Sequence, residues 1–178
     1  MTRELVAHLR THALRTDGPF RLRSGEVSHY YVDARQTTFD GRGALLVAEA
    51  VLEVLHPDVA AIGGMTMGAD PVAISTAVEA SRRGRPLRAF SVRKAAKDHG
   101  TGGRLVGPVR EGDVVAVVDD TVTTGGALIE AVEVATAEGL RVIQGVALVD
   151  RSAGRVARRF EELGIPFVGL VGPDDLGV

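Results

Sequence analysis

The 178-residue sequence contains no cysteine. Disulfide bonds, thiolate catalysis and zinc sites with cysteine ligands are therefore excluded. An excess of one charge is also missing, because 21 Lys and Arg residues stand against 23 Asp and Glu residues, for a net charge of -2. Such a balance gives no broad basic surface to attract nucleic acid or an acidic membrane, so neither is expected as a partner. Only local basic clusters are left as candidate anion-binding elements.

Long apolar runs are missing as well. No stretch approaches the ~20 apolar residues that span a bilayer. The first ten residues, MTRELVAHLR, mix charged and apolar side chains and lack the apolar centre of a secretory signal, so we expect a cytoplasmic protein. Hydrophobic residues make up 45% and charged residues 25%, a composition typical of a globular protein with one good core. The length fits about one domain, on a prior of roughly 150 residues per domain, so residues 1–178 are expected to form it.

Apolar runs and helical patterns alternate along the chain. Leu5, Leu9 and Leu14 predict an opening helix, followed by short strands near 20–23 and 29–33. Further strands are expected at 59–62, 87–92, 114–118, 142–149 and 166–171, and helices at 44–55, from 70 onward, at 125–138 and around 155–159. Strands without polar alternation, separated by helices, predict an α/β fold with a mostly parallel central sheet flanked by helices. In such folds ligands bind at the carboxyl ends of the strands.

The segment VVAVVDDTVTTGGA, residues 114–127, places two acids, three threonines and two glycines after an apolar run. A helix beginning near Gly125 has free N–H groups and a partial positive charge at its start, so residues 121–127, here called the phosphate turn, can cradle a phosphate. Asp119 and Asp120 would then lie beneath a sugar, where carboxylates accept hydrogen bonds from vicinal hydroxyls and oppose positive charge on the ring. A simple strand-to-helix turn with an acidic cap is the alternative, but the number of suitable residues favours a ribose-phosphate site.

Two common phosphate motifs do not match this segment. No Gly-Lys-Ser/Thr closes it, and it lacks the GxGxxG fingerprint, which excludes the usual NTPase and dehydrogenase functions. The segment instead resembles the 5-phosphoribosyl 1-diphosphate (PRPP) binding motif of the type I phosphoribosyltransferases, which include regulators that kept the fold. The resemblance implies that PRPP binds to Asp119, Asp120, Thr121, Val122, Thr123, Thr124, Gly125, Gly126 and Ala127.

A second motif, RKAAKDHG at residues 93–100, follows a predicted strand and carries three cations and a histidine. In a flexible loop, Lys and Arg can neutralise a diphosphate leaving group and His can donate a proton or hydrogen bond, whereas a solvated basic loop is the alternative. The motif resembles the catalytic loop of the orotate phosphoribosyltransferases. The resemblance implies a homodimer in which residues 93–103 close over the neighbouring subunit's site. It also implies that diphosphate binds to Arg93, Lys94, Lys97 and His99, and that the catalytic residues are Lys97, His99, Asp119 and Asp120.

The segment LVDR at 148–151 ends another predicted strand. A guanidinium can hold a planar carboxylate with two hydrogen bonds, although an ion pair with Asp150 is the simpler interpretation of these residues alone. In the orotate phosphoribosyltransferase family the arginine at this place grips the orotate carboxylate, which implies that Arg151, together with Thr123, binds orotate. The segments at 20–25 and 30–33 resemble the family's N-terminal hood, expected over about residues 1–40, but their aromatic residues fit a core equally well.

The sequence departs from the family pattern at several places. Arg23 stands where many members have lysine, and Thr121 stands where an aliphatic residue is commoner, with little expected effect. The segment GGMTMGADP at 63–71 lacks the Tyr-Lys of many relatives, so diphosphate affinity should depend more on residues 93–99. The remaining basic residues are interpreted as solvated helix ends and faces or as scattered histidines that form no metal site: Arg82, Arg83, Arg85, Arg88, Arg155, Arg158, Arg159, His8, His12, His29 and His56.

Together the motifs predict transfer of ribose 5-phosphate from PRPP to orotate, giving orotidine 5′-monophosphate and diphosphate in UMP biosynthesis. Bond breaking at the ribose C1 leaves an oxocarbenium-like centre, which calls for placed charges more than for a nucleophile. Mg²⁺ is the expected cofactor, held mainly by PRPP oxygens and water with no direct protein ligand assigned. A purine-base transferase, which would have no use for Arg151, and a nucleic-acid-binding regulator without activity are the alternatives.

Overall fold

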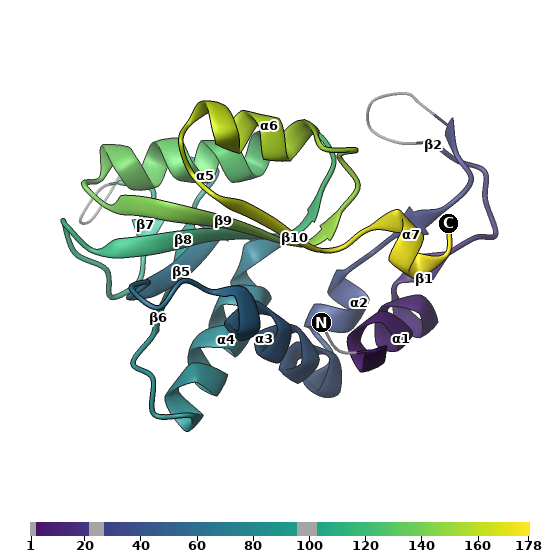
Figure 1. Ribbon diagram of the computed structural model, residues 1–178, viewed down its shortest axis with the longest axis horizontal. Helices are drawn as coiled ribbons and strands as arrows, with labels where there is room; N and C mark the ends of the chain where they lie inside the picture. The colour runs from purple at the N-terminus through teal and green to yellow at the C-terminus, as the bar shows by residue number, and fades with distance from the viewer. Residues whose placement is uncertain (1–2, 22–26, 96–102) are drawn as a thin grey trace.

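The computed structural model describes residues 3–21, 27–95 and 103–178 (Figure 1). In this part of the chain a six-stranded sheet has the order β10-β9-β8-β5-β6-β7. All neighbouring strands are parallel except β7, which is antiparallel to β6. The strands are β5 (Ala61–Met65), β6 (Arg88–Val92), β7 (Leu105–Val106), β8 (Val114–Val122), β9 (Arg141–Asp150) and β10 (Phe167–Val171).

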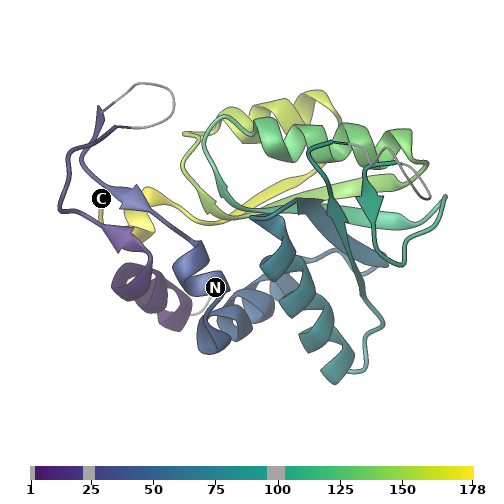
Figure 2. The same ribbon diagram turned by 180° about the vertical axis from the view of Figure 1, so that it is seen from behind.

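Helices cover both faces of this sheet. Figures 1 and 2 show α5 (Gly126–Ala137) and α6 (Arg155–Glu162) on one face, and α3 (Gly41–Val54) and α4 (Ala69–Arg82) on the other. Successive residues of a strand point to opposite faces, and β8 accordingly contributes Ala116 and Val118 to the core under α3 and α4 and Val115 and Val117 to the core under α5 and α6. The α/β fold with a mostly parallel, helix-flanked sheet is confirmed.

Local sequence explains how two of these helices are set. Asp40 precedes α3, and its carboxylate accepts hydrogen bonds from the N–H groups of Arg42 (3.0 Å) and Gly43 (3.3 Å), which caps the helix start. Gly145 of β9 lets α6 approach the sheet, because a Cβ there would lie 2.3 Å from Cε1 of Phe160. Asp40 therefore fixes the start of α3, and Gly145 allows α6 to pack closely against β9.

The N-terminal region packs beside α3 and the C-terminal segment (Figure 1). Strand β1 pairs with β4, and β2 with β3, both antiparallel. Its elements are α1 (Arg3–His12), β1 (Leu14–Arg15), β2 (Phe20–Arg21), β3 (Val27–Ser28), β4 (Tyr31–Val32) and α2 (Arg35–Thr38), and α7 (Pro173–Leu176) follows β10.

The elements differ from the sequence predictions at several boundaries. Leu14 was assigned to the opening helix, but α1 ends at His12 and Leu14 pairs with Val32 in a strand. Strand β8 runs to Val122, past the predicted end at 118, because Asp119, Thr121 and Val122 continue to pair with β9. The one-turn helices α2 and α7 and the strand β7 were not predicted. No helix in the described ranges is long and apolar enough to cross a membrane.

Candidate active site

The carboxyl ends of β5, β8 and β9 bring the predicted site segments together. Asp119 and Asp120 lie near the carboxyl end of β8. The segment 63–71, which begins in β5 and continues beyond its carboxyl end, packs against them. A Cβ on Gly68 would lie 2.7 Å from Oδ1 of Asp120 and 3.0 Å from Oδ1 of Asp119. Only glycine therefore fits at position 68 without displacing the two carboxyl groups.

The two acids lie in a poorly solvated position. Asp119 is 8% exposed, and burial, followed by the charge of Asp120, raises the pKa of Asp119 to about 7. Burial also raises the pKa of Asp120, against the lowering effect of its hydrogen bond from the Thr121 N–H (2.7 Å) and of the charge of Arg35. Burial disfavours the ionised forms of both acids. A ligand that supplies hydroxyl donors or positive charge would stabilise these ionised forms, which favours binding of such a ligand over one without these groups.

The phosphate turn presents backbone donors at the start of α5. Gly125 has a φ of 75°, a left-handed conformation that favours glycine, and a Cβ there would lie 2.7 Å from Cγ2 of Val156. Among residues 3–21, 27–95 and 103–178 no side chain caps α5, so the first N–H groups of this helix are available to an anion. Thr123, Thr124, Gly126 and Ala127 are exposed, whereas Val122 and Gly125 are buried.

Thr121, the first residue of the turn, is half-buried. Its Oγ1 is buried and has no hydrogen-bond partner among the described residues. The Thr121 N–H donates to Asp120 Oδ1, so this residue supports the acid through its backbone.

The base of the basic loop is fixed to the sheet and to α5. The Arg93 N–H donates to the Arg104 carbonyl (2.8 Å), the Arg104 Nε donates to the Arg93 carbonyl (2.7 Å), and the Arg104 guanidinium pairs with Glu130. Lys94 is exposed next to this base. The predicted catalytic residues Lys97 and His99 lie outside the described residues. Arg104 and Glu130 were not predicted, since no local pattern relates residues 26 positions apart.

Arg151 meets the N-terminal region. Its guanidinium carbon lies 4.4 Å from the centre of the Tyr30 ring, and its nitrogens lie 3.4 Å from Tyr30 Oη and 3.5 Å from Ser28 Oγ. The alternative, an ion pair between Arg151 and Asp150, is not found among the described residues, and the Asp150 carboxylate accepts a hydrogen bond from the Ser152 N–H (2.8 Å). Two long contacts leave most of the five guanidinium donors of Arg151 available to a ligand.

Arg35 is a site residue that the sequence interpretation missed. Its Nε lies 2.7 Å from Asp33 Oδ1, and its charge lowers the pKa of Asp120. Asp33 was considered only as the end of the hood segment. The sequence DAR at 33–35 carries the signal, because an acid and a base two residues apart can pair across the start of a short helix.

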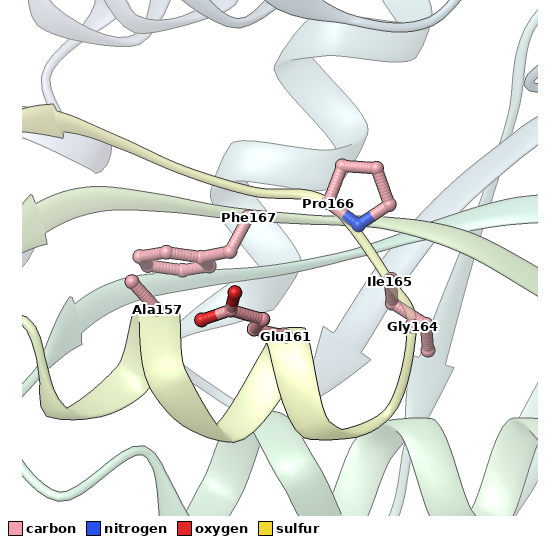
Figure 3. Close-up of a pocket in the computed structure, with 6 residues that line it drawn as sticks. All are labelled: Ala157, Glu161, Gly164, Ile165, Pro166 and Phe167. Carbon is pink, nitrogen blue, oxygen red and sulfur yellow. The ribbon is translucent and has the colours of Figure 1, made fainter.

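The pocket in Figure 3 lies away from these groups. It is lined by α6 and by the segment entering β10: Ala157, Glu161, Gly164, Ile165, Pro166 and Phe167. Phe167 begins β10, so this pocket is at the amino ends of the strands, whereas the acids are at the carboxyl ends. Its one charged lining side chain is Glu161.

Comparison with known proteins identifies the family. No protein-family model matches the chain. The orotate phosphoribosyltransferase of Streptomyces coelicolor is 42% identical over 176 residues, which cover 98% of this chain and 96% of that protein. The chain belongs to the orotate phosphoribosyltransferase family. Family membership confirms the predicted enzyme class, a phosphoribosyltransferase.

Solved orotate phosphoribosyltransferase structures have the same fold. The Mycobacterium tuberculosis enzyme in complex with Fe(III) dicitrate has a TM-score of 0.85 and 35% identity, covering 99% of this chain and 98% of that chain. The same enzyme in complex with PRPP has a TM-score of 0.81 and 31% identity over the same shares of the two chains. The type I phosphoribosyltransferase fold predicted from the two motifs is therefore confirmed.

Proposed function

We propose that this chain transfers ribose 5-phosphate from PRPP to orotate, giving orotidine 5′-monophosphate and diphosphate for UMP biosynthesis. The observation that carries the proposal is the meeting, at one edge of the sheet, of the acid pair Asp119 and Asp120, a turn with free N–H groups and an arginine beside the N-terminal region. These groups match the sugar, the phosphate and the carboxylate of the two substrates. The family relationship supports the same reaction.

Charge placement would carry the reaction. The free N–H groups of the phosphate turn would hold the 5-phosphate, and Asp119 and Asp120 would accept hydrogen bonds from the ribose hydroxyls. As the bond at C1 breaks, carboxylates beneath the ring oppose the positive charge that develops there. Arg151 would bind the orotate carboxylate, with Tyr30 stacked on its guanidinium, and the exposed hydroxyl of Thr123 would lie within the same region.

Mg²⁺ would enter this site together with PRPP, next to Asp119 and Asp120. The described residues contain no group of three or more His, Cys, Asp or Glu side chains able to hold a metal. Asp119, whose pKa is raised to about 7, and Asp120 are the two adjacent carboxyl groups that this site offers. Mg²⁺ dehydrates reluctantly and usually keeps waters and substrate oxygens as ligands. When bound, the ion would neutralise diphosphate charge.

The basic loop and a second subunit complete the proposal. Lys97 and His99 would stabilise the departing diphosphate, joined by Arg93 and Lys94, and residues 93–103 would reach the neighbouring site of a homodimer. An apolar stripe on and before α4 supports such a contact, because Met67, Ile74 and Val78 are each 57% exposed. A single domain over residues 1–178 and a cytoplasmic location stay predictions.

An assay with three different bases tests this function. The protein is incubated with PRPP, Mg²⁺ and either orotate, adenine or hypoxanthine, and loss of each base is followed. We expect consumption of orotate alone. Consumption of a purine alone would replace the substrate assignment, and salt-dependent binding of RNA or DNA without any turnover would favour a regulator.

A further inference from the structure

Arg159 joins helix α6 to the phosphate turn. Its Nη1 donates a hydrogen bond to the carbonyl oxygen of Thr124 at 3.0 Å, across 35 positions of sequence. The contact between Gly125 and Val156 brings the same two elements together, with no room for a side chain at position 125. Arg159 therefore lies beside the turn and is more than part of a solvated helix face.

This hydrogen bond fixes the orientation of one peptide group. The bond between Thr124 and Gly125 is planar and trans, so its C=O and N–H point in opposite directions. With the Thr124 carbonyl held toward Arg159, the Gly125 N–H is directed away from that guanidinium. No acceptor for this N–H is found in the described part of the chain, which leaves it free for a ligand.

Positive charge is concentrated in the first part of α6. Three arginines, Arg155, Arg158 and Arg159, lie on the helix, and none forms an ion pair with a carboxylate in the described ranges. Arg155 instead donates to the Ser152 carbonyl at 3.0 Å. The charge of Arg159, which contacts the turn directly, favours a phosphate dianion over a neutral ligand at the free N–H groups.

We propose that Arg159 is a positioning residue for PRPP: it holds the Thr124–Gly125 peptide so that the Gly125 N–H faces the 5-phosphate. The inference rests on the proposed function and adds a residue from outside the motif. It assigns Arg159 no contact with the reacting atoms, so it should affect binding of the phosphate end and leave the chemical step unchanged.

Steady-state kinetics of Arg159→Gln, Arg159→Lys and Arg158→Gln test this role. Arg158 provides a matched control, since it is exposed, loses the same charge on substitution and makes no side-chain hydrogen bond or ion pair in the described residues. We expect Arg159→Gln to raise the KM for PRPP about tenfold, the scale of one charge-assisted hydrogen bond, with kcat and the KM for orotate changed by less than about twofold. Arg159→Lys should recover part of the loss.

Equal effects of Arg159→Gln and Arg158→Gln on the KM for PRPP would overturn the proposal, because a general field would then explain both. A fall in kcat with unchanged KM would overturn it as well. Calorimetric binding of ribose 5-phosphate separates this inference from the proposed function. Weaker binding by Arg159→Gln than by Arg158→Gln supports the positioning role even if the wild type does not consume orotate, and equal binding contradicts it.

Discussion

The two charged segments of the site are built in different ways. The acids belong to a central strand, where Asp119 is buried and Asp120 half-buried, and each accepts a hydrogen bond from the next residue's N–H. The described residues that flank the basic loop are held together by Arg104, which contacts both Arg93 and Glu130. The acids are thus fixed within a strand, where burial raises their pKa values, whereas Arg93 and Lys94 follow the end of β6. We infer a preorganised site for the sugar, and the predicted closing loop would adapt to the leaving group.

Replacing Asp119 by Asn should change the pH dependence of stability most. A pKa raised from 3.8 to about 7 in the folded state makes the wild type lose free energy of unfolding as pH rises between those values. Asn removes this contribution, so its free energy of unfolding relative to wild type should rise by about 4 kcal/mol between pH 4 and pH 8. Urea unfolding across this range measures the difference. Parallel curves for the two proteins would show that Asp119 ionises normally.

The substitution Lys97→Ala tests the catalytic role of the basic loop. We expect kcat to fall by about 100-fold, the scale of one lost transition-state donor. Lys97→Arg, which keeps the charge, should retain more activity. Turnover close to wild type in the alanine variant would remove Lys97 from the catalytic role.

Arg104→Gln should loosen the anchored base of the loop. Loss of its contacts to Arg93 and Glu130 is expected to lower kcat/KM about five- to tenfold, the scale of a hydrogen bond to a charged group. Arg88→Gln is a matched control, because Arg88 pairs with Asp113 at 2.8 Å near the start of β6, far from the acids. If both variants lose activity equally, the contacts of Arg104 with Arg93 and Glu130 have no specific effect on catalysis.

Thr121→Val should have the smallest effect. Its Oγ1 is buried without a hydrogen-bond partner in the described residues, so an isosteric methyl group removes an unsatisfied polar atom. The free energy of unfolding should stay the same or rise by up to about 1 kcal/mol, as read from urea unfolding. A clear loss of stability would mean that the hydroxyl has a partner in solution.

The sequence predicted those parts of the site that consist of contiguous residues. The apolar run, the acid pair and the Thr/Gly turn are contiguous, so strand, acids and helix start could be placed from residues 114–127 alone. Strand β8 was predicted too short because its last residues are stabilised by pairing with β9, which no local pattern records.

Contacts between distant segments could not be read in the same way. Arg88 was interpreted as a solvated residue, but it lies in β6 and pairs with Asp113. Arg159 was interpreted as part of a solvated helix face, but its side chain donates a hydrogen bond to the Thr124 carbonyl. Arginine side chains are long enough to reach many acceptors, so their partners depend on tertiary packing. The role of Arg151 came only from family resemblance, and its stacking on Tyr30 required the fold.

The most direct test of the function is the ultraviolet absorbance of orotate in the presence of the wild-type protein. The account predicts that absorbance falls only when PRPP and Mg²⁺ are both present, with release of diphosphate. Unchanged orotate absorbance under these conditions, with folded protein and intact PRPP, would contradict it.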